Sequence, residues 1–285
     1  MDKNNVGKIY DLKMTDSEFR RLSGFITEHA GIKLPEVKKV MLQSRLHKRL
    51  RFLNMSSFNE YIDYIFSEEG LQYEIIHMLD VVSTNKTDFF REPVHFDFMK
   101  DVILPEYVDS FPLNRPMKIW SAGCSSGEEV YTIAMTVEDF KKNHPGLDYS
   151  ILGTDISTDI LNRALNGVYK EEKIKNIPIN TKKKYFLRSK DRSKKKARVI
   201  KDLRNKARFQ RLNFMDISYS VTDVYDVVFC RNVLIYFNRN VQEQVINKII
   251  TKLRSGGYFF IGHSESIMGM DVPLKQIKPT IFQRI

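Results

Sequence analysis

Residues 120–129 read Trp-Ser-Ala-Gly-Cys-Ser-Ser-Gly-Glu-Glu, and they follow a short predicted strand at 117–120 and lead into a predicted helix ending near residue 142. Small residues at such a turn let the backbone approach a ligand closely. The Gly-x-x-x-Gly spacing alone is weak evidence, because a tight structural turn explains it equally well, and it differs from the dinucleotide pattern Gly-x-Gly-x-x-Gly. Glu128 and Glu129 would repel a pyrophosphate, so they favour a ligand with positive charge, such as a sulfonium and an amino group.

Beyond this turn, segments with strand character alternate with segments of helical periodicity. The further elements predicted are strands at 150–154, 225–230 and 258–261, helices at 159–166 and 240–253, and a turn at Gly256-Gly257 before the last strand. Strands that alternate with helices are typical of a parallel, doubly wound α/β sheet. In such a sheet, ligands bind beyond the carboxyl ends of the strands.

The chain before the sheet shows only helical patterns. Residues 15–82 begin with a capping box, in which Thr15 is the N-cap and Glu18 lies three positions further on. Helical periodicity then continues with no strand pattern. We therefore predict a small all-α domain at 1–82, followed by an α/β domain at 83–285.

Residues of about 170–211 interrupt the alternation and carry most of the excess charge. Short strand candidates at 197–200 and 207–212 predict a small antiparallel β-subdomain inserted in the α/β domain. This insertion holds 18 basic and 4 acidic residues, whereas residues 1–82 hold 12 of each, and the whole chain has a formal charge of +11. The charge indicates an acidic partner for this segment.

Composition excludes several classes of protein. The 285 residues are 42% hydrophobic, enough for a sizeable core, and no apolar run approaches the roughly 20 residues that cross a bilayer. Residues 1–11 are polar and lack the apolar core of a signal peptide. Cys124 and Cys230 are too few for a disulfide framework or a zinc cluster. We predict a reduced, cytoplasmic protein that holds no metal and does not insert into a membrane.

Polar residues follow two of the predicted strands. Asp155 could accept hydrogen bonds from both ribose hydroxyls of a nucleoside. The alternative is that it caps the following helix, although Ser157 or Thr158 could do this instead. Arg231 and Asn232 interrupt an apolar run, and burying them unpaired would cost kilocalories. A binding cleft at the end of the strand would account for them.

Two further segments carry candidate residues. Tyr236 follows the same apolar run and could be either an ordinary core residue or a functional one. Asn85, Thr87 and Arg91 form a polar series beside Phe89-Phe90, in the connection between the predicted domains. A solvated linker would not need two aromatic residues, so this segment is predicted to pack on the α/β domain and close its cleft.

Together these blocks resemble the CheR family of chemotaxis receptor methyltransferases, from about residue 15 to the C-terminus. The resemblance implies a helical N-terminal domain, a class I (Rossmann-like) S-adenosylmethionine-dependent methyltransferase domain and an inserted β-subdomain. The matching blocks, in order, are Asn85-Lys86-Thr87, Phe89-Phe90-Arg91-Glu92, residues 120–129, Asp155-Ile156, Phe229-Cys230-Arg231-Asn232-Val233, Ile235-Tyr236-Phe237 and Gly262-His263-Ser264-Glu265.

The resemblance also assigns roles to residues. Arg91 and Tyr236 would be catalytic and would face the transferring methyl group and the incoming carboxylate. Where the family often has leucine, this chain has Phe214 beside the adenine. The residues implied to bind S-adenosylmethionine, and its product S-adenosylhomocysteine, are Asn85, Thr87, Arg91, Glu129, Asp155, Asn213, Phe214, Arg231 and Asn232.

The reaction implied is methyl ester formation on glutamate side chains of the receptors. A glutamate with a pKa of roughly 4.3 is already ionised near neutral pH, so this displacement needs no general base. Catalysis would then depend mainly on placing donor and nucleophile in line. The lack of a Ser/His/Asp or metal-ligand pattern in the sequence agrees with this chemistry.

Two surfaces are candidates for docking the receptor. Lys38, Arg45 and Arg49 share one face of a predicted helix, with Lys48 beside it. This face could be merely solvated, or it could bind the acidic cytoplasmic helices that carry the substrate glutamates. In some family members the β-subdomain binds a peptide at the receptor C-terminus by strand addition.

Two other functions stay open on the sequence. A methyltransferase cleft beside a basic segment could belong to an RNA methyltransferase. The basic segment lacks a series of aromatic residues that could stack on bases, so we expect no nucleic-acid partner. The third reading is a catalytically silent module that binds the cofactor and transmits a signal by contact. The complete set of implied site residues argues against loss of activity.

Overall fold

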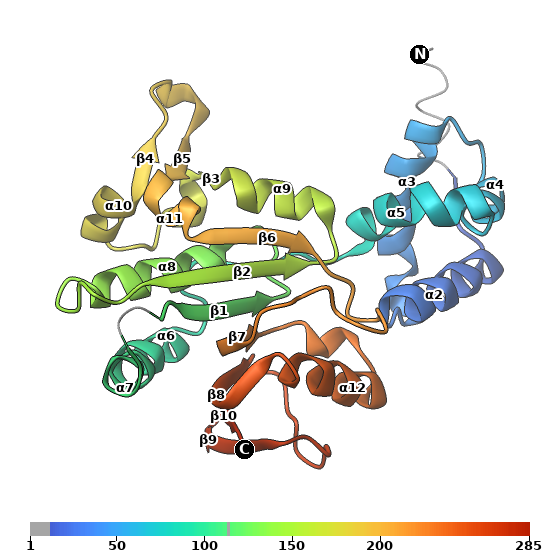
Figure 1. Ribbon diagram of the computed structural model, residues 1–285. Helices are drawn as coiled ribbons and strands as arrows, with labels where there is room; N and C mark the ends of the chain where they lie inside the picture. The colour runs from blue at the N-terminus through green and yellow to red at the C-terminus, as the bar shows by residue number, and fades with distance from the viewer. Residues whose placement is uncertain (1–11, 113–114) are drawn as a thin grey trace.

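The computed structural model describes residues 12–112 and 115–285. The prediction about the polar segment 1–11 lies outside the described residues. The described chain forms a helical domain beside a larger α/β domain, and a small β-subdomain rises from one edge of the latter (Figure 1). Within the described ranges, no helix combines the length and apolar character needed to span a membrane.

The N-terminal domain is all-helical, as predicted. Thr15 and Glu18 form the expected capping box, and Gly31 ends the first helix with a φ of +70°. Leu22, Leu42 and Leu46 are among the fully buried side chains of its separate core. Its elements are α2 (Asp16–Ala30), η1 (Glu36–Lys38), α3 (Lys39–Leu53), α4 (Phe58–Ile65), η2 (Gly70–Glu74) and α5 (Ile75–Val82).

A seven-stranded sheet forms the α/β domain, in the order β6-β2-β1-β7-β8-β10-β9. Strands β6, β2, β1, β7 and β8 are parallel, and β10 is antiparallel to both of its neighbours. The strands are β1 (Met117–Ala122), β2 (Tyr149–Asp155), β6 (Ala207–Arg211), β7 (Tyr225–Cys230), β8 (Leu253–Ile261), β9 (Leu274–Lys278) and β10 (Ile281–Arg284).

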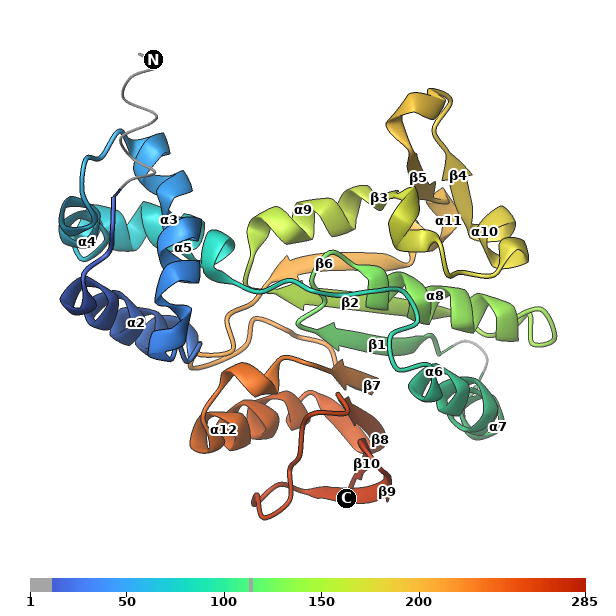
Figure 2. The same ribbon diagram turned by 180° about the vertical axis from the view of Figure 1, so that it is seen from behind.

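Helices cover both faces of this sheet (Figures 1 and 2). Alternate residues of β7 point to opposite sides: Val227 joins the core beneath α8, whereas Val228 joins the core beneath α12. Because both faces are buried, the strand is apolar along most of its length. The helices are α6 (Val94–Phe98), η3 (Met99–Ile103), α7 (Leu104–Ser110), α8 (Glu128–Phe140), α9 (Thr158–Asn166), η6 (Leu234–Tyr236) and α12 (Arg239–Ile250).

The inserted β-subdomain is smaller than the sequence suggested. Its three strands are antiparallel in the order β3-β5-β4. The second strand candidate, 207–212, was placed wrongly in the insertion, because Ala207–Arg211 is β6 and pairs in parallel with β2 of the main sheet. The insertion contains β3 (Val168–Lys170), η4 (Glu171–Ile174), α10 (Ile179–Tyr185), β4 (Phe186–Arg188), η5 (Arg192–Lys194), β5 (Lys196–Val199) and α11 (Lys201–Asn205).

A second prediction fails at Gly256-Gly257, which lie inside β8 and not in a turn before it. Gly256 has a φ of +71°, and the pairing of β8 with β7 shifts register in this region. The two glycines therefore mark an irregularity within a longer strand.

The predicted basic docking face does not form as expected. Arg49 is buried, and its guanidinium donates to both oxygens of Glu74 at 2.7 and 2.6 Å. Tyr61 donates to the same carboxylate at 2.9 Å. Arg49 was therefore wrongly assigned to a solvent-facing surface, and it stabilises the helical domain from inside.

Replacing Arg49 with alanine would leave the Glu74 carboxylate buried without its cation. Breaking a buried pair in this way is expected to lower the free energy of unfolding by about 3 kcal/mol. Thermal unfolding of Arg49→Ala measures the loss. The neighbouring Lys48→Ala is the matched control, since Lys48 is exposed and should change stability by less than about 0.5 kcal/mol. Equal melting temperatures for both variants would contradict the structural role.

Candidate active site

The turn between β1 and α8 needs glycine at two positions. Gly123 and Gly127 have φ values of +84° and +89°, which side chains rarely adopt. A Cβ on Gly123 would lie 2.3 Å from Cγ2 of Val233, and one on Gly127 would lie 2.9 Å from Cβ of Ala164. The Gly-x-x-x-Gly spacing is therefore required by the backbone conformation and by the packing of this turn, independently of any ligand.

A cavity of about 260 Å³ lies where β1, β2 and β7 end. The helical domain closes one side of it with Ile32, Leu34 and Met41, a contribution that the sequence analysis did not predict. All ten residues expected to bind the cofactor or act in catalysis line this cavity: Asn85, Thr87, Arg91, Glu129, Asp155, Asn213, Phe214, Arg231, Asn232 and Tyr236.

Asp155 lies at the end of β2, with both carboxylate oxygens held by backbone amides. Ser125 N–H donates to Oδ2 at 2.9 Å, and Ser157 N–H donates to Oδ1 at 3.0 Å. Burial raises the pKa of Asp155 above its ordinary value, while these backbone hydrogen bonds act in the opposite direction. Ser157 caps α9 through its hydroxyl, so the alternative role of Asp155 as the cap is wrong.

Arg231 follows β7 and forms a buried ion triad. Its Nη1 lies 2.9 Å from Oε2 of Glu129, and its Nη2 lies 2.9 Å from Oε2 of Glu92. The side chain is 2% exposed, and it also donates to the backbone carbonyl of Arg91. A second oxygen of Glu129 accepts from Ser121 Oγ at 2.7 Å. These two ion pairs therefore explain how the charge of Arg231 can be buried, which the sequence alone did not explain.

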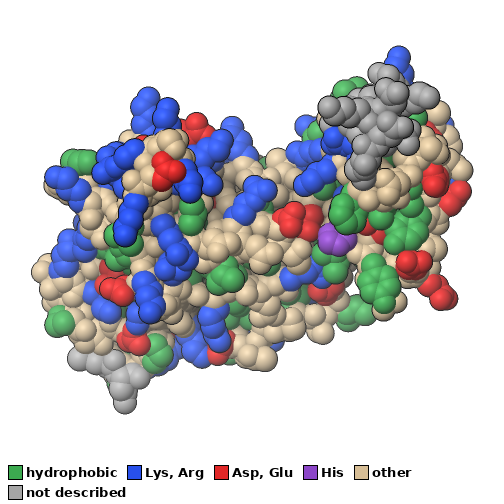
Figure 3. All heavy atoms as spheres, turned by 90° about the horizontal axis from the view of Figure 1, so that it is seen from above, with side chains coloured by type: hydrophobic (Ala, Val, Ile, Leu, Met, Phe, Trp, Pro, Cys, Tyr) green, Lys and Arg blue, Asp and Glu red, His purple; other side chains and the backbone are tan. Residues whose placement is uncertain are grey.

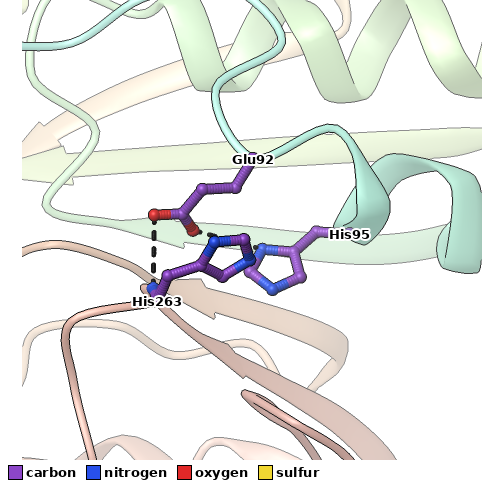
Figure 4. A group of neighbouring side chains, drawn as sticks. All are labelled: Glu92, His95 and His263. Atoms are coloured by element: carbon purple, nitrogen blue, oxygen red, sulfur yellow. Dashed lines mark hydrogen bonds and ion pairs between the residues drawn. The ribbon is translucent and has the colours of Figure 1, made fainter.

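Glu92 connects the segment after the helical domain with the turn after β8 (Figure 4). Its Oε1 accepts from the backbone N–H of His263 at 3.2 Å, and its Oε2 lies 3.6 Å from Nδ1 of His95. Burial alone would raise the pKa of Glu92, but the hydrogen bond and charge of Arg231 hold it below the ordinary value. Burial, aided by the charge of Arg231, lowers the pKa of His95 to about 3, so this ring is neutral.

Glu265 fixes the backbone of residues 231–236. Its Oε2 accepts from the N–H groups of Gly262 at 2.6 Å and Asn232 at 2.9 Å, and Oε1 accepts from Ile235 at 3.4 Å. Asn232 has a φ of +60°, which these bonds help to maintain. Sequence reasoning gave no role to Glu92 or Glu265, although both lie in motifs that it quoted.

Arg91 and Tyr236 are both half-buried in the cavity wall. Arg91 Nη1 donates to the carbonyl of Lys86 at 3.3 Å. The carbonyl of Tyr236 accepts from the N–H of Lys33 at 2.9 Å, which ties the helical domain to this segment. Burial raises the pKa of Tyr236, so its phenol stays protonated near neutral pH. Because Tyr236 is only half-buried and lines the cavity, it is not an ordinary core residue.

Asn213 and Phe214 lie beyond β6. Asn213 Nδ2 donates to the carbonyl of His29 at 2.6 Å, so this amide joins the two domains. Phe214 is buried, and its ring packs edge-on against those of Tyr219 and Phe237. One edge of this aromatic cluster contributes to the cavity.

The other residues of the predicted docking face do not all lie together. Arg45 donates to the carbonyls of Val82 and Ser83 and thus holds the start of the linker. Lys38 lines the cavity described above. Lys48 is exposed and borders a separate groove that Arg45 and Arg163 also line. The structure therefore does not bring the four basic side chains together on one exposed surface.

Comparison with known proteins adds an independent observation. Residues 17–83 match the all-alpha domain of the CheR methyltransferases, and residues 85–282 match their S-adenosylmethionine-binding domain. The chemotaxis protein methyltransferase of Borreliella burgdorferi is 38% identical, over 96% of this chain and 96% of that protein. The corresponding Escherichia coli protein is 34% identical, over 91% of this chain and 88% of its own length.

The chain belongs to the CheR methyltransferase family. Its larger domain has the class I methyltransferase fold, and S-adenosylmethionine is its cofactor, as the sequence resemblance implied. The cavity at the ends of β1, β2 and β7 lies within the matched cofactor-binding domain. The CheR-type assignment, the fold class and the methyltransferase activity predicted from the sequence are confirmed.

Replacing Glu265 with glutamine would direct amide N–H groups toward backbone donors. We expect a loss of about 2 kcal/mol in unfolding free energy, because buried N–H groups lose acceptors. Turnover should fall as well, since the segment that carries Tyr236 would shift. Thermal unfolding and methyl transfer measure the two effects. The control is Glu172→Gln, at an exposed glutamate, and an unchanged Glu265→Gln variant would refute the anchoring role.

Proposed function

We propose that this chain transfers the methyl group of S-adenosylmethionine to glutamate side chains of chemotaxis receptors, forming methyl esters. The observation that carries this proposal is that all ten candidate residues line one cavity. Among the described residues that line it, none is a histidine. This lining suits a nucleophile that is already ionised and needs no base.

The chemistry of the lining fits the parts of the cofactor. The carboxylates of Asp155 and Glu129 suit the ribose hydroxyls and the positively charged amino group respectively. Phe214 and Asn213 provide an aromatic surface and an amide for adenine. We assign the remaining contacts, to the methionyl part of the cofactor, to Asn85, Thr87, Arg91, Arg231 and Asn232.

The transfer moves no proton. The carboxylate oxygen of the substrate forms a bond to the methyl carbon as the bond from carbon to sulfur breaks, and the electron pair of that bond stays on sulfur. Negative and positive charge neutralise each other, giving the methyl ester and S-adenosylhomocysteine. We propose that Arg91 attracts the incoming carboxylate and that the protonated hydroxyl of Tyr236 donates to the oxygen that does not react. Their contribution would be mainly orientation.

The proposed partners are the cytoplasmic helices of the receptors, so we place the protein in the cytoplasm. A peptide at the receptor C-terminus is a further candidate partner for the β-subdomain. In the described chain, β3 and β4 each pair only with β5, which leaves outer edges that an added strand could use. Lysine and arginine side chains crowd the lobe that contains this subdomain (Figure 3), which suits an acidic peptide.

Transfer of radiolabelled methyl groups to membranes that contain chemotaxis receptors tests the reaction. We expect label on the receptor that mild alkali releases as methanol, which is diagnostic of a glutamyl ester. Alkali-stable label on RNA, with none on receptor, would favour a nucleic-acid methyltransferase. Cofactor binding without transfer to either would favour the silent signalling module.

Tyr236→Phe removes only a hydroxyl from the cavity wall. We expect turnover to fall about tenfold or more, because one orienting hydrogen bond to a charged group contributes about 1.5–3 kcal/mol. Affinity for S-adenosylhomocysteine, measured by calorimetry, should stay near that of the unchanged protein. Unchanged turnover would remove the hydroxyl from the mechanism.

A further inference from the structure

Glu92, His95 and His263 form a cluster whose potential metal-ligand atoms all lie within 4.8 Å of one another (Figure 4). Glu92 and His95 lie three positions apart at the start of α6, whereas His263 follows β8, 171 positions after Glu92. None of the three lines the cofactor cavity. Two imidazole nitrogens and one carboxylate oxygen are a ligand set that Zn²⁺ takes in proteins, so the cluster is a candidate metal site.

The ring of His95 is fully buried, and its two nitrogens have different surroundings. Nε2 lies 2.7 Å from Oγ1 of Thr280, whose hydroxyl donates to the carbonyl of Pro279 at 2.6 Å. Because the hydroxyl hydrogen is directed to that carbonyl, Nε2 must donate to the Thr280 oxygen. Burial lowers the pKa of His95 to about 3, which keeps the ring neutral. Nδ1 therefore carries a lone pair and no hydrogen.

This lone pair is directed toward a carboxylate. Nδ1 of His95 lies 3.6 Å from Oε2 of Glu92, which is too long for a hydrogen bond. Within the described chain, Nδ1 has no hydrogen-bond partner, which is unfavourable for a buried polar atom. Ligand atoms at about 2.0–2.2 Å from a tetrahedral Zn²⁺ lie roughly 3.3–3.6 Å from one another. The separation of Nδ1 and Oε2 therefore fits two ligands of one ion.

His263 supplies the third ligand and a path of entry. It is exposed, and its ring lies edge-on to that of His95, with the centroids 5.3 Å apart. Exposed side chains change rotamer within nanoseconds, so this ring can close on an ion that enters from solvent. Three protein ligands leave one position of a tetrahedral ion for a water.

The local balance of charge favours a cation, although Arg231 lies nearby. The guanidinium of Arg231 lies 2.9 Å from both Glu92 and Glu129, so two negative charges face one positive charge. A carboxylate has lone pairs enough to accept from an arginine and to bind an ion at once. A divalent cation beside Glu92 would therefore be held by a net negative charge.

We propose that Glu92, His95 and His263 bind Zn²⁺, or a divalent cation with the same preference for nitrogen ligands. This site goes beyond the proposed function, which gives no role to a metal, and it departs from the sequence-based expectation that the protein holds none. The sequence did not indicate the site, because only the fold brings the third ligand to the other two. A bound ion would connect the segment after the helical domain with the turn after β8.

Calorimetric titration of the full chain with Zn²⁺, after treatment with a chelator that is then removed, tests the site. We expect one ion per chain with a Kd in the micromolar range or tighter. An excess of Mg²⁺ should not compete, because Mg²⁺ prefers oxygen ligands. Binding only at millimolar Zn²⁺ would overturn the proposal.

His263→Ala removes one ligand at an exposed position and keeps the backbone N–H that donates to Glu92. Loss of a group that merely orients a metal ligand costs about 10–100-fold in affinity, so loss of the ligand itself should weaken Zn²⁺ binding about 100-fold or more. The matched control is His77→Ala, at an exposed histidine of α5, which should bind Zn²⁺ as the unchanged protein does. Equal affinity in the unchanged protein and in His263→Ala would refute the assignment.

Two further measurements are independent of that titration. Zn²⁺ should raise the melting temperature of the unchanged protein and of His77→Ala by mass action, but not that of His263→Ala. Without metal, all three proteins should melt alike, which shows that the variants fold. In crystals of the unchanged protein soaked in Zn²⁺, we expect an anomalous difference peak between Nδ1 of His95 and Oε2 of Glu92. Peaks only at other places would overturn the proposal.

Discussion

The guanidinium of Arg231 is the charge on which the walls of the cavity depend. Its side chain is 2% exposed and is paired with Glu92, from the segment after the helical domain, and with Glu129, from the start of α8. Unpairing a buried charge costs several kcal/mol, so neither carboxylate can move away freely. This ion triad therefore holds three segments of the chain together, and residues of all three segments line the cavity.

Much of this arrangement could be predicted because the topology of a parallel sheet brings the ends of its strands to one edge. Asp155, Glu129 and Arg231 are far apart in the chain, yet each follows a strand that the hydrophobic pattern identified, or begins the helix after it. The local signals were also reliable: the capping box at Thr15 formed as predicted. The sequence could not show that Asp155 is held by the N–H groups of Ser125 and Ser157, because that depends on the exact path of two turns.

The incorrect predictions share a physical cause. The periodicity of a segment indicates its secondary structure, but it does not indicate which other segment of the chain it packs or pairs with. Arg49 shares a helical face with Lys38 and Arg45, but Glu74, 25 residues away, draws it into the core. Ala207–Arg211 has the pattern of a short strand in either sheet, and pairing with β2 assigns it to the larger one. The anchoring role of Glu265 likewise depends on amides at Asn232 and Ile235, about 30 positions earlier.

Methyl transfer to a carboxylate requires the donor and the acceptor to be positioned, and it requires no proton transfer. Three ionisable groups around this cavity have pKa values that suit this requirement. The pKa of Glu92 is lowered beside Arg231, that of His95 is lowered to about 3, and that of Tyr236 is raised by burial. None of these shifts moves a group toward neutral pH, so their charges stay constant where a receptor glutamate is ionised. Constant charge on these three groups and an anchored backbone help to keep donor and acceptor aligned, which is the main contribution that this reaction requires from the protein.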